Sequence, residues 1–179
     1  MAPGRRPRIR RYDRHAMDAK PAAESRSELV KWMGIADANS AGFVHGGVLM
    51  RLCDEVAGIA GIRHSGSRVV TAAMDRMTFL HPVNIGELLI CSASVNAVWR
   101  TSMEIGVRVE AENPRTGERR HTSTAYLTMV GIDDDGTPVP VPELIVESEA
   151  EARRQREAEL RRRNRLAERE QILRDRGEA

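Results

Sequence analysis

Cysteine is scarce in this sequence of 179 residues. Cys53 and Cys91 are the only two, and both stand in apolar stretches. Two cysteines are too few for a disulfide framework, and their apolar surroundings predict reduced, packed thiols in a cytoplasmic protein. The histidines share no metal-ligand spacing, and the glycines form neither a dinucleotide-binding nor a phosphate-binding loop. The sequence therefore predicts no metal site and carries no pattern of a nucleotide cofactor.

The sequence also lacks a long apolar run and a strong net charge. No uninterrupted apolar segment is long enough for a membrane span, and residues 1–14 carry the positive charge of a signal peptide without its apolar centre. We therefore expect a cytoplasmic protein with no membrane span. Lysine and arginine total 28 against 26 aspartates and glutamates, a formal net charge of +2. Charge thus gives the folded part no reason to bind nucleic acid.

Composition divides the chain into three parts. Residues 1–26 are rich in Arg, Pro and Ala without periodicity, which predicts a disordered basic tail. Residues 27–146 are long enough for one domain with a single core. Residues 147–179 carry Glu and Arg three or four positions apart, which predicts an exposed, charged helix. The leucines of this last part are too sparse for a sustained coiled coil.

The stretch 48–64 has the pattern of a buried helix. It reads VLMRLCDEVAGIAGIRH, and its apolar residues recur at helical spacing over most of the circumference. The acidic pair Asp54-Glu55 stands inside it. A carboxylate in a buried helix is costly unless it is paired, hydrogen-bonded or facing a wet cavity. Asp54 is therefore either a catalytic group or a structural carboxylate, for instance one that pairs with Arg51, and Glu55 is expected at the surface.

Strand patterns surround this helix. Period-two or β-branched patterns predict five strands, at residues 27–33, 68–80, 87–99, 102–112 and 119–132. The order is one strand, a long buried helix and then four strands. This order is typical of an α+β fold in which an antiparallel sheet is wrapped around one helix.

Four motifs resemble those of one family. They are D-A-N-x-x-G-x-V-H-G-G at 37–47, M-x-L-x-D-E-V-A-G at 50–58, V-V-T-A-A-M-D-x-M-x-F at 69–79 and S-M-E-I at 102–105. They are similar to motifs of the hotdog-fold acyl-CoA thioesterases, in particular the cytosolic acyl-CoA hydrolase group. The resemblance implies a hotdog fold and hydrolysis of fatty acyl-CoA, of medium to long chain, to free fatty acid and CoA. It implies no cofactor, because CoA is part of substrate and product, and a homo-oligomer, either a dimer or a trimer of dimers.

The resemblance also implies where the active site lies. In tandem-domain members of the group, the active Asn and the active Asp come from different domain copies. Here Asn39 and Asp54 stand in one domain, so each site would draw Asn39 from one subunit and Asp54 from its partner. Helix geometry agrees, because Asp54 follows Gly46 by eight residues, which is about 12 Å along a helix. Two antiparallel helices from paired subunits would bring both groups to one carbonyl.

Thioester hydrolysis gives each candidate a role. Asp54 is either a general base that takes a proton from water or a nucleophile that forms an anhydride. Asn39 would orient the water or hold the thioester. The expected oxyanion and substrate site is the helix start, where backbone N–H groups are free; its residues are His45, Gly46, Gly47 and Val48. His45 is alternatively no more than a capping neighbour.

A further set of residues is expected to contact CoA. Arginine suits bidentate phosphate binding, and the candidates are Arg63, Arg100, Thr101 and Ser102. The small residues Ala57, Gly58 and Gly61 leave space beside Asp54. That space serves either an acyl chain or the close approach of another helix or strand.

Two rival functions stay open on the sequence. Another hotdog chemistry, the hydration or dehydration of acyl thioesters, resembles this one but uses a His with an acidic partner; His45 is present, while the surrounding motif is absent. A non-enzymatic module would bind acyl-CoA without turnover, or bind nucleic acid through the basic residues 1–26.

Overall fold

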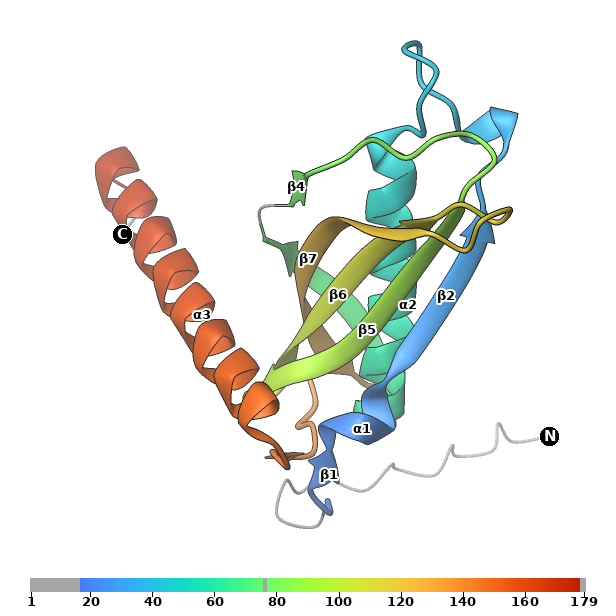
Figure 1. Cartoon of the computed structure of the whole chain (residues 1–179). Helices are drawn as coiled ribbons and strands as arrows, with labels where there is room; N and C mark the ends of the chain where they lie inside the picture. Colours follow the sequence, from blue (N-terminus) through green and yellow to red (C-terminus); the bar gives the residue numbers. More distant parts are fainter. Residues whose placement is uncertain (1–16, 76, 178–179) are drawn as a thin grey trace, which may run out of the picture.

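The computed structural model describes residues 17–75 and 77–177. A six-stranded antiparallel sheet forms the centre, with strand order β2-β5-β6-β7-β3 and a short strand β4 that also pairs with β7 (Figure 1). The strands are β2 (Ser27–Trp32), β3 (Arg68–Met74), β4 (Thr78–Phe79), β5 (Leu88–Val98), β6 (Ser102–Glu112) and β7 (Arg119–Ile132). The predicted antiparallel sheet is confirmed, and its strands begin and end within one residue of the prediction except at 68–80.

Helix α2 (Gly46–Ser65) lies in the hollow of this curled sheet. Alternate residues of the central strands point toward it, which is the two-residue period of a sheet with one face in the core. Val56 and Ala60 of the helix and Val107 and Leu127 of the sheet are fully buried members of this core. The packing of α2 on the sheet therefore fixes the position of every residue on the helix, Asp54 included.

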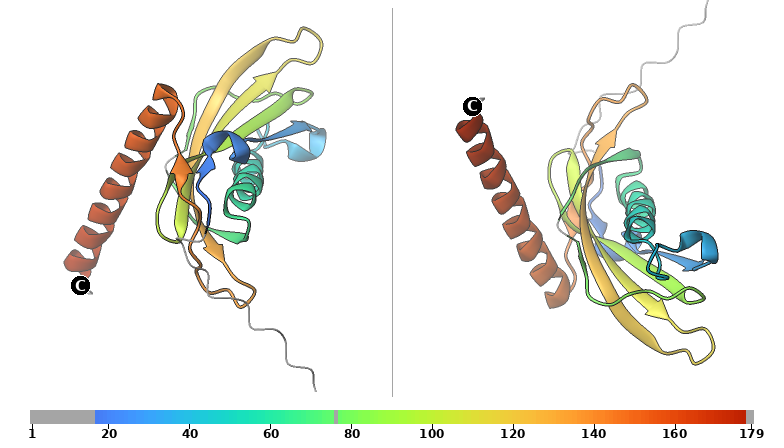
Figure 2. Two further views of the ribbon diagram at one scale, coloured as in Figure 1. Left: turned by 90° about the horizontal axis from the view of Figure 1, so that it is seen from below. Right: turned by 90° about the horizontal axis from the view of Figure 1, so that it is seen from above.

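Helix α3 (Glu149–Arg176) stands on the other side of the sheet, so that the layers are α2, sheet and α3 (Figure 2). The prediction of an exposed, charged helix is correct for its second half and wrong for its first. Glu104 of β6 is fully buried, and Arg161 of α3 donates to its two carboxylate oxygens at 2.7 and 3.1 Å. Arg165 binds Asp75 at 2.9 Å. The partners of the first pair are 57 residues apart in sequence and those of the second are 90 apart. No local sequence pattern therefore predicts either pair.

The folded part begins earlier than predicted. We expected disorder up to residue 26, but a two-residue strand β1 (Lys20–Pro21) pairs with β8 (Leu144–Ile145), and one helical turn, α1 (Ala22–Ser25), follows it. Ser25 is fully buried, and its hydroxyl oxygen accepts the N–H of Val95 at 2.9 Å. A short segment held by single polar contacts has no periodicity for a sequence argument to detect. Residues 1–16 of the predicted tail lie outside the described residues.

The stretch 68–80 forms two strands where one was predicted. Met74 pairs with Leu127 and Thr78 with Thr124, so this side of the ladder holds one residue more than β7 does. An extra residue on one side interrupts the pairing of an antiparallel ladder. The regular pairing with β7 is therefore interrupted between β3 and β4, although the N–H of Asp75 still donates to the carbonyl of Tyr126 at 2.8 Å.

Candidate active site

Asn39 lies in the loop between the short 3-10 helix η2 (Ile35–Asp37) and α2. Its side-chain oxygen accepts hydrogen bonds from the backbone N–H groups of Ala41 (2.9 Å) and Phe43 (3.2 Å). This is the local turn that asparagine favours. Within the described residues its NH2 group has no partner. Asn39 thus shapes its own loop through the oxygen and keeps the nitrogen free to donate to a ligand.

Asp37 fixes the base of this loop. Lys31 Nζ donates to one carboxylate oxygen at 2.6 Å, and the N–H of Gly34 donates to the other at 3.0 Å. The hydrogen bond from Lys31, followed by that from Gly34, holds the pKa of Asp37 below its usual value. The backbone carbonyl of Asp37 accepts the N–H of His45 at 2.8 Å. One carboxylate residue therefore ties together β2, the Asn39 loop and the start of α2.

The start of α2 offers fewer free N–H groups than the sequence suggested. His45 caps the helix: its Nδ1 accepts the N–H of Gly47 at 2.9 Å, and its carbonyl accepts that of Val48 at 2.9 Å. Both N–H groups are thus engaged in this chain, and His45 has the contacts of the capping alternative. The N–H of Gly46 has no partner among the described residues. A Cβ atom at Gly46 would stand 3.3 Å from the ring of Phe79, so a side chain there would press on that ring.

Asp54 is exposed at the side of α2 that lies next to β3. The hydroxyl of Thr71 donates to its Oδ1 at 2.5 Å. Arg51 pairs with Glu55 instead, at 2.9 Å and on the surface, so the Arg51–Asp54 pair that the sequence left open does not form. Although α2 as a whole is packed on the sheet, Asp54 is an accessible carboxylate held by one hydroxyl group.

Thr71 is the site residue that the sequence analysis missed. It faces α2 because side chains alternate along a strand and Val69, two residues earlier, packs against Gly61 of α2; the bulge at Ala72 then turns the following residues to the other face. Thr71 lies opposite Met129, which belongs to the core, whereas Ala73 lies opposite Thr128 on the outer face of the sheet. Thr71 stands inside one of the family motifs, but nothing in a β-branched strand marks one threonine as the partner of a helix residue.

Within one chain, Asn39 and Asp54 stand at separate places. A groove of about 320 Å³ lies beside Asn39, between Phe43 and Leu80, and Asp54 is not part of its wall. Along α2, the rise from Gly46 to Asp54 is about 12 Å. A reaction that needs both groups therefore needs a second copy of one of them.

The small residues near Asp54 have different surroundings. At Gly61 a Cβ atom would meet Ile105 and Val69 at 3.3 Å, so this glycine lets the sheet pack closely on the helix. At Gly58, one turn after Asp54, nothing lies within 4 Å of that position. The sequence left open whether the small residues allow close packing or leave space for an acyl chain. Gly61 allows close packing of the sheet on the helix, whereas Gly58 leaves open space beside Asp54.

The thiol next to Asp54 in sequence is not part of this surface. Cys53 and Cys91 are free thiols that lie fully buried in the core. The hydrogen bond between them, together with burial, raises the pKa of Cys53 far above its ordinary value. Cys53 is therefore a protonated core residue, whereas Asp54 is exposed to solvent.

The expected CoA contacts do not all come together. Arg63 stands near the end of α2, far from the helix start, and its guanidinium donates to the carbonyl of Arg26 at 2.5 Å. Arg100 and Thr101 form the turn between β5 and β6. Ser102 begins β6 and lines a groove under α3. Arg100, Thr101 and Ser102 therefore lie together at the β5–β6 turn, and Arg63 lies apart from them on α2.

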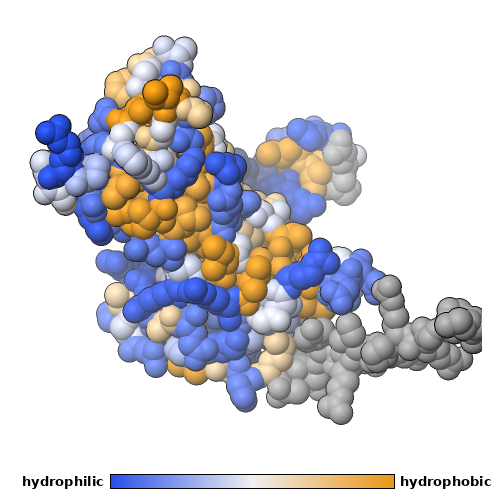
Figure 3. Space-filling view, turned by 90° about the vertical axis from the view of Figure 1, so that its right-hand side faces the viewer, coloured by the Kyte–Doolittle hydropathy of each residue, from blue (hydrophilic) through white to orange (hydrophobic). Residues whose placement is uncertain are grey.

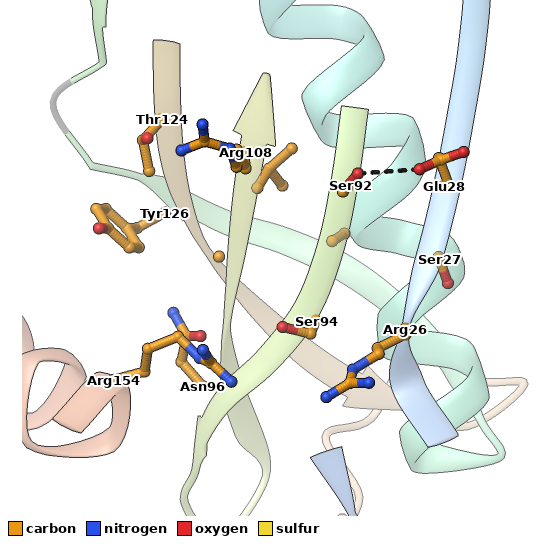
Figure 4. Close-up of a pocket in the computed structure, with 13 residues that line it drawn as sticks. Arg26, Ser27, Glu28, Ser92, Ser94, Asn96, Arg108, Thr124, Tyr126 and Arg154 are labelled. Atoms are coloured by element: carbon orange, nitrogen blue, oxygen red, sulfur yellow. Dashed lines mark hydrogen bonds between the residues drawn. The ribbon is translucent and has the colours of Figure 1, made fainter. Parts of the chain in front are cut away.

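A hollow of about 620 Å³ lies on the outer face of β2, β5, β6 and β7. Figure 4 shows Arg26, Arg108 and Arg154 around it, and Ser92 donating to Glu28 across two strands at 3.2 Å. None of the predicted catalytic residues lines this hollow. Although this hollow is large, we therefore do not take it as the candidate active site.

No helix in the described ranges is both long and apolar enough to cross a membrane. Over residues 17–75 and 77–177, no group of three or more His, Cys, Asp and Glu side chains is arranged to hold a metal ion.

The sequence matches the family model of the thioesterase superfamily over residues 41–118. It is 39% identical over 97 residues to protein VdlD of Helicobacter pylori, a match that covers 54% of this chain and 56% of VdlD. It is 36% identical over 114 residues to the cytosolic acyl coenzyme A thioester hydrolase of Homo sapiens, covering 63% of this chain and 30% of that protein. An uncharacterized acyl-CoA thioester hydrolase of Zymomonas mobilis is 34% identical over 122 residues, or 68% of this chain and 82% of the relative. The chain thus spans little more than half the length of VdlD and less than a third of the human protein.

Solved structures are similar over most of the chain. An apo-hexameric acyl-CoA thioesterase has a TM-score of 0.81 and 35% identity, over 85% of this chain and 97% of that one. The acyl-CoA hydrolase of Staphylococcus aureus, in complex with butyryl coenzyme A, coenzyme A and coenzyme A disulfide, has a TM-score of 0.81 and 30% identity, over 88% and 96%. Other structures of the S. aureus hydrolase carry alanine in place of an asparagine at position 28, an aspartate at position 43 or a threonine at position 60.

Proposed function

This chain belongs to the thioesterase superfamily and has its hotdog fold, and on that premise we propose that it hydrolyses acyl-CoA thioesters to a free acid and CoA. The observation that carries the proposal is the exposed Asp54 carboxylate, held by the Thr71 hydroxyl at the edge strand of the sheet. This carboxylate is open to solvent, and its orientation is fixed by the Thr71 hydroxyl. Both properties suit a group that takes a proton from water or attacks a carbonyl.

The substitutions in the S. aureus hydrolase support this choice of residues. The three substituted positions, 28 (Asn), 43 (Asp) and 60 (Thr), have the spacing of Asn39, Asp54 and Thr71, with each number lower by 11. The proposal therefore places an asparagine, an aspartate and a threonine of the same spacing in the active site of this chain. Asn39 and Asp54 are the catalytic residues, and Thr71 orients Asp54.

Each site is shared between two subunits in the proposal. Strand β3 is at the edge of the sheet, so its outer backbone groups can pair with the β3 of a second copy. Pairing of this kind sets two α2 helices side by side and antiparallel. The Asp54 of one subunit then approaches the Asn39 loop of the other.

The surface supports such an assembly. Apolar residues gather over a broad area of the face seen in Figure 3. Large apolar side chains that are exposed include Trp32 (71%), Ile35 (87%) and Ile62 (51%). Exposed apolar area of this extent is typical of a surface that another chain covers. One structural neighbour is named as hexameric. We propose a hexamer for this chain too, built as a trimer of dimers.

The free donors of the loop define the oxyanion site. The N–H groups of Gly47 and Val48 are engaged by His45, so the proposal gives the role to the NH2 group of Asn39 and the N–H of Gly46. As water attacks the thioester carbon, Asp54 of the partner subunit takes its proton, and these donors stabilise the negative oxygen. The C–S bond then breaks, and CoA leaves as the thiol with that proton. The alternative, attack by Asp54 to form an anhydride that water hydrolyses, gives the same products.

Chain length and location are proposed from the resemblance. We expect acyl chains of medium to long length, although the S. aureus hydrolase is described with the short-chain butyryl coenzyme A. The human relative is named cytosolic, which supports the proposed cytoplasmic location.

The experiment that tests the function is the release of free thiol from a series of saturated acyl-CoA esters, from butyryl- to palmitoyl-CoA. We expect turnover, with the highest kcat/KM in the medium to long range. Enoyl-CoA is supplied in a parallel assay. Binding of every thioester without thiol release would contradict hydrolysis and favour an acyl-CoA-binding module, and hydration of enoyl-CoA alone would favour a hydratase.

A further inference from the structure

The hollow of about 620 Å³ on the outer face of β2, β5, β6 and β7 has the size of a small-molecule site, for which about 300–1,000 Å³ is typical. We refer to it as the outer-face hollow. Of the described residues that line it, none belongs to β3, which joins the subunits in the proposed dimer. None is an exposed apolar side chain such as Trp32 or Ile35. Formation of the proposed dimer therefore leaves the hollow open.

Two guanidinium groups meet at one end of the hollow. Arg26 follows α1, and Arg154 belongs to the first turns of α3. Their Nη2 atoms lie 3.5 and 3.8 Å from the same carboxylate oxygen of Glu151, and Figure 4 shows both groups beside Ser94. Within the described residues, neither guanidinium donates a hydrogen bond. Two cations thus share one carboxylate, and this end of the hollow keeps a positive charge and free N–H donors.

The wall next to these arginines contains buried polar atoms that lack partners. Asn96 is 2% exposed; its Nδ2 donates to Glu104 at 3.2 Å, and its Oδ1 has no partner. The Nε of Arg154 is likewise buried without a partner. Gly106 makes room for the amide, because a Cβ atom there would stand 2.6 Å from Nδ2. One buried acceptor and one buried donor are therefore left unpaired by this chain, and pairing them with a ligand removes a free-energy cost.

The other end of the hollow suits hydroxyl groups better than a second anion. Glu28 lies there, and its Oε2 accepts the hydroxyl of Ser92 at 3.2 Å. Arg108 is neutralised by Glu110, whose Oε1 accepts two of its N–H groups at 2.9 and 3.1 Å. A carboxylate repels anions and accepts hydrogen bonds from hydroxyl groups. The hollow thus has a cationic end for one anionic group and an acidic end for hydroxyls.

We propose that the outer-face hollow binds a small sugar phosphate. Its phosphate group binds Arg26 and Arg154, whose forked N–H groups match phosphate oxygens. Its hydroxyl groups, which both donate and accept, pair with Asn96 at the wall and Glu28 at the far end. The hollow is larger than a phosphate ion needs, and Glu28 opposes a second phosphate group, which disfavours CoA and nucleoside polyphosphates. The inference goes beyond acyl-CoA hydrolysis, because the residues of the proposed active site do not line the hollow.

The first test is calorimetric titration of the full chain, which measures binding without turnover. The probes are ribose 5-phosphate, inorganic phosphate and ribose. We expect ribose 5-phosphate to bind on the order of tenfold more tightly than inorganic phosphate, and ribose to show no measurable binding. Affinity for ribose 5-phosphate no higher than for inorganic phosphate would overturn the proposal.

Matched variants locate the site. Arg154→Gln removes one of the two guanidinium groups. Arg153→Gln removes the same charge from the neighbouring position, which pairs with Glu157 on the surface and does not line the hollow. We expect Arg154→Gln to lower the affinity for ribose 5-phosphate about tenfold and Arg153→Gln to leave it unchanged. Equal affinities of the two variants would place the ligand elsewhere and contradict the assignment.

A third variant, Glu28→Ala, separates the two parts of the ligand. Glu28 is exposed, so the fold should tolerate the change. Affinity for ribose 5-phosphate should fall about fivefold, because the acceptor for the sugar is lost, while affinity for inorganic phosphate should not fall. An equal loss for both probes, or no loss for either, would contradict the role of Glu28. None of these measurements needs thiol release, so failure of this inference and failure of the proposed function are separate results.

Discussion

Asn39 combines two tasks in one side chain, and substitutions separate them. Its oxygen shapes the loop by accepting the N–H groups of Ala41 and Phe43, and its NH2 group is the proposed donor to the thioester. Asn39→Asp keeps an acceptor for both N–H groups and loses the donor, so we expect kcat to fall on the order of a hundredfold with little change in melting temperature. Asn39→Ala should lose similar activity and also melt earlier. Enzyme assays and calorimetry of both variants measure this, and a fully active Asn39→Asp would contradict the donor role.

Asp54 is the residue on which the proposed chemistry depends. Asp54→Asn has the same shape and still accepts the hydrogen bond from Thr71, so we expect the fold to stay and kcat to fall by about two to four orders of magnitude. The matched control is Glu55→Gln, because Glu55 is the neighbouring carboxylate and is engaged with Arg51 on the surface. Thiol release from acyl-CoA is the measurement. Full activity in Asp54→Asn, or an equal loss in the control, would remove Asp54 from the mechanism.

A buried ion pair between Arg161 and Glu104 helps to fasten helix α3 to the sheet. Glu104 is fully buried, where it accepts hydrogen bonds from Arg161 (2.7 and 3.1 Å) and Asn96 (3.2 Å). Arg161→Met leaves this carboxylate without its cation, so we expect the free energy of unfolding to fall by about 3–5 kcal/mol. The double variant with Glu104→Gln should regain most of the loss, because the buried charge is then absent. Urea unfolding of both proteins measures the difference.

The control for the ion pair is Arg174→Met on the exposed second half of α3. Arg174 pairs with Glu170 one turn away, and both side chains are more than half exposed. Such a pair contributes about 0–1 kcal/mol. A loss in Arg161→Met no larger than that of this control would show that the buried pair does not hold α3.

His64 joins the end of α2 to the segment before β8. It is fully buried, and its Nε2 lies 3.1 Å from the carbonyl oxygen of Pro142. Burial lowers the pKa of His64 below its ordinary value of 6.5, against the opposing effect of that carbonyl. The unfolded chain therefore takes up the proton at a higher pH than the folded one. Stability contributed by the neutral ring is complete above pH 6.5 and is lost as the pH falls below it, by up to about 1.4 kcal/mol per unit.

Thermal unfolding between about pH 7.5 and pH 5.5 tests this. His64→Gln removes the titrating ring, so its melting temperature should fall less over this range than that of the wild type. Lys20 and Glu24, the charged groups that act on His64, are present in both proteins and do not enter the comparison. Equal slopes in the two proteins would contradict the assignment to His64.

Helices α2 and α3 differ in how far their sequence predicts their packing. The apolar residues of α2 and of the strands repeat with the period of the element, because one face of each lies in the core. Docking of the first half of α3 depends instead on Arg161 meeting Glu104, a partner 57 residues away. No local pattern tells a buried ion pair from surface charges. The sequence therefore predicts the sheet and α2 correctly, and it predicts the wrong surroundings for half of α3.

At the candidate site, the sequence indicates residues but not their contacts. Asn39, His45 and Asp54 come from the motifs, whereas the hydrogen bonds of Asn39 and His45 to their own loop and helix depend on backbone geometry. The same holds for Thr71, which reaches Asp54 because α2 packs on the face of β3 that carries Val69 and Thr71. The strand pattern gives the face of a threonine, but the helix residue that it meets depends on how the helix lies on the sheet.

At the scale of the whole molecule, one chain holds the parts of a site without assembling them. The Asn39 loop stands at the start of α2, and Asp54 lies about 12 Å further along the helix. The edge strand β3 and the exposed apolar side chains of β2, η2 and α2 are the surfaces through which a second copy would complete the site. In the proposed mechanism, catalysis therefore needs a pair of subunits.

The most direct measurement is a mixing experiment with two inactive variants, Asn39→Asp and Asp54→Asn, unfolded together and refolded so that subunits exchange. In a mixed dimer, one site combines both substitutions and the other draws intact Asn39 and Asp54 from different subunits. With random pairing, we expect the mixture to regain about a quarter of wild-type thiol release, while each variant refolded alone stays inactive. If the mixture stays as inactive as the separate variants although mixed dimers form, the two residues do not act across subunits.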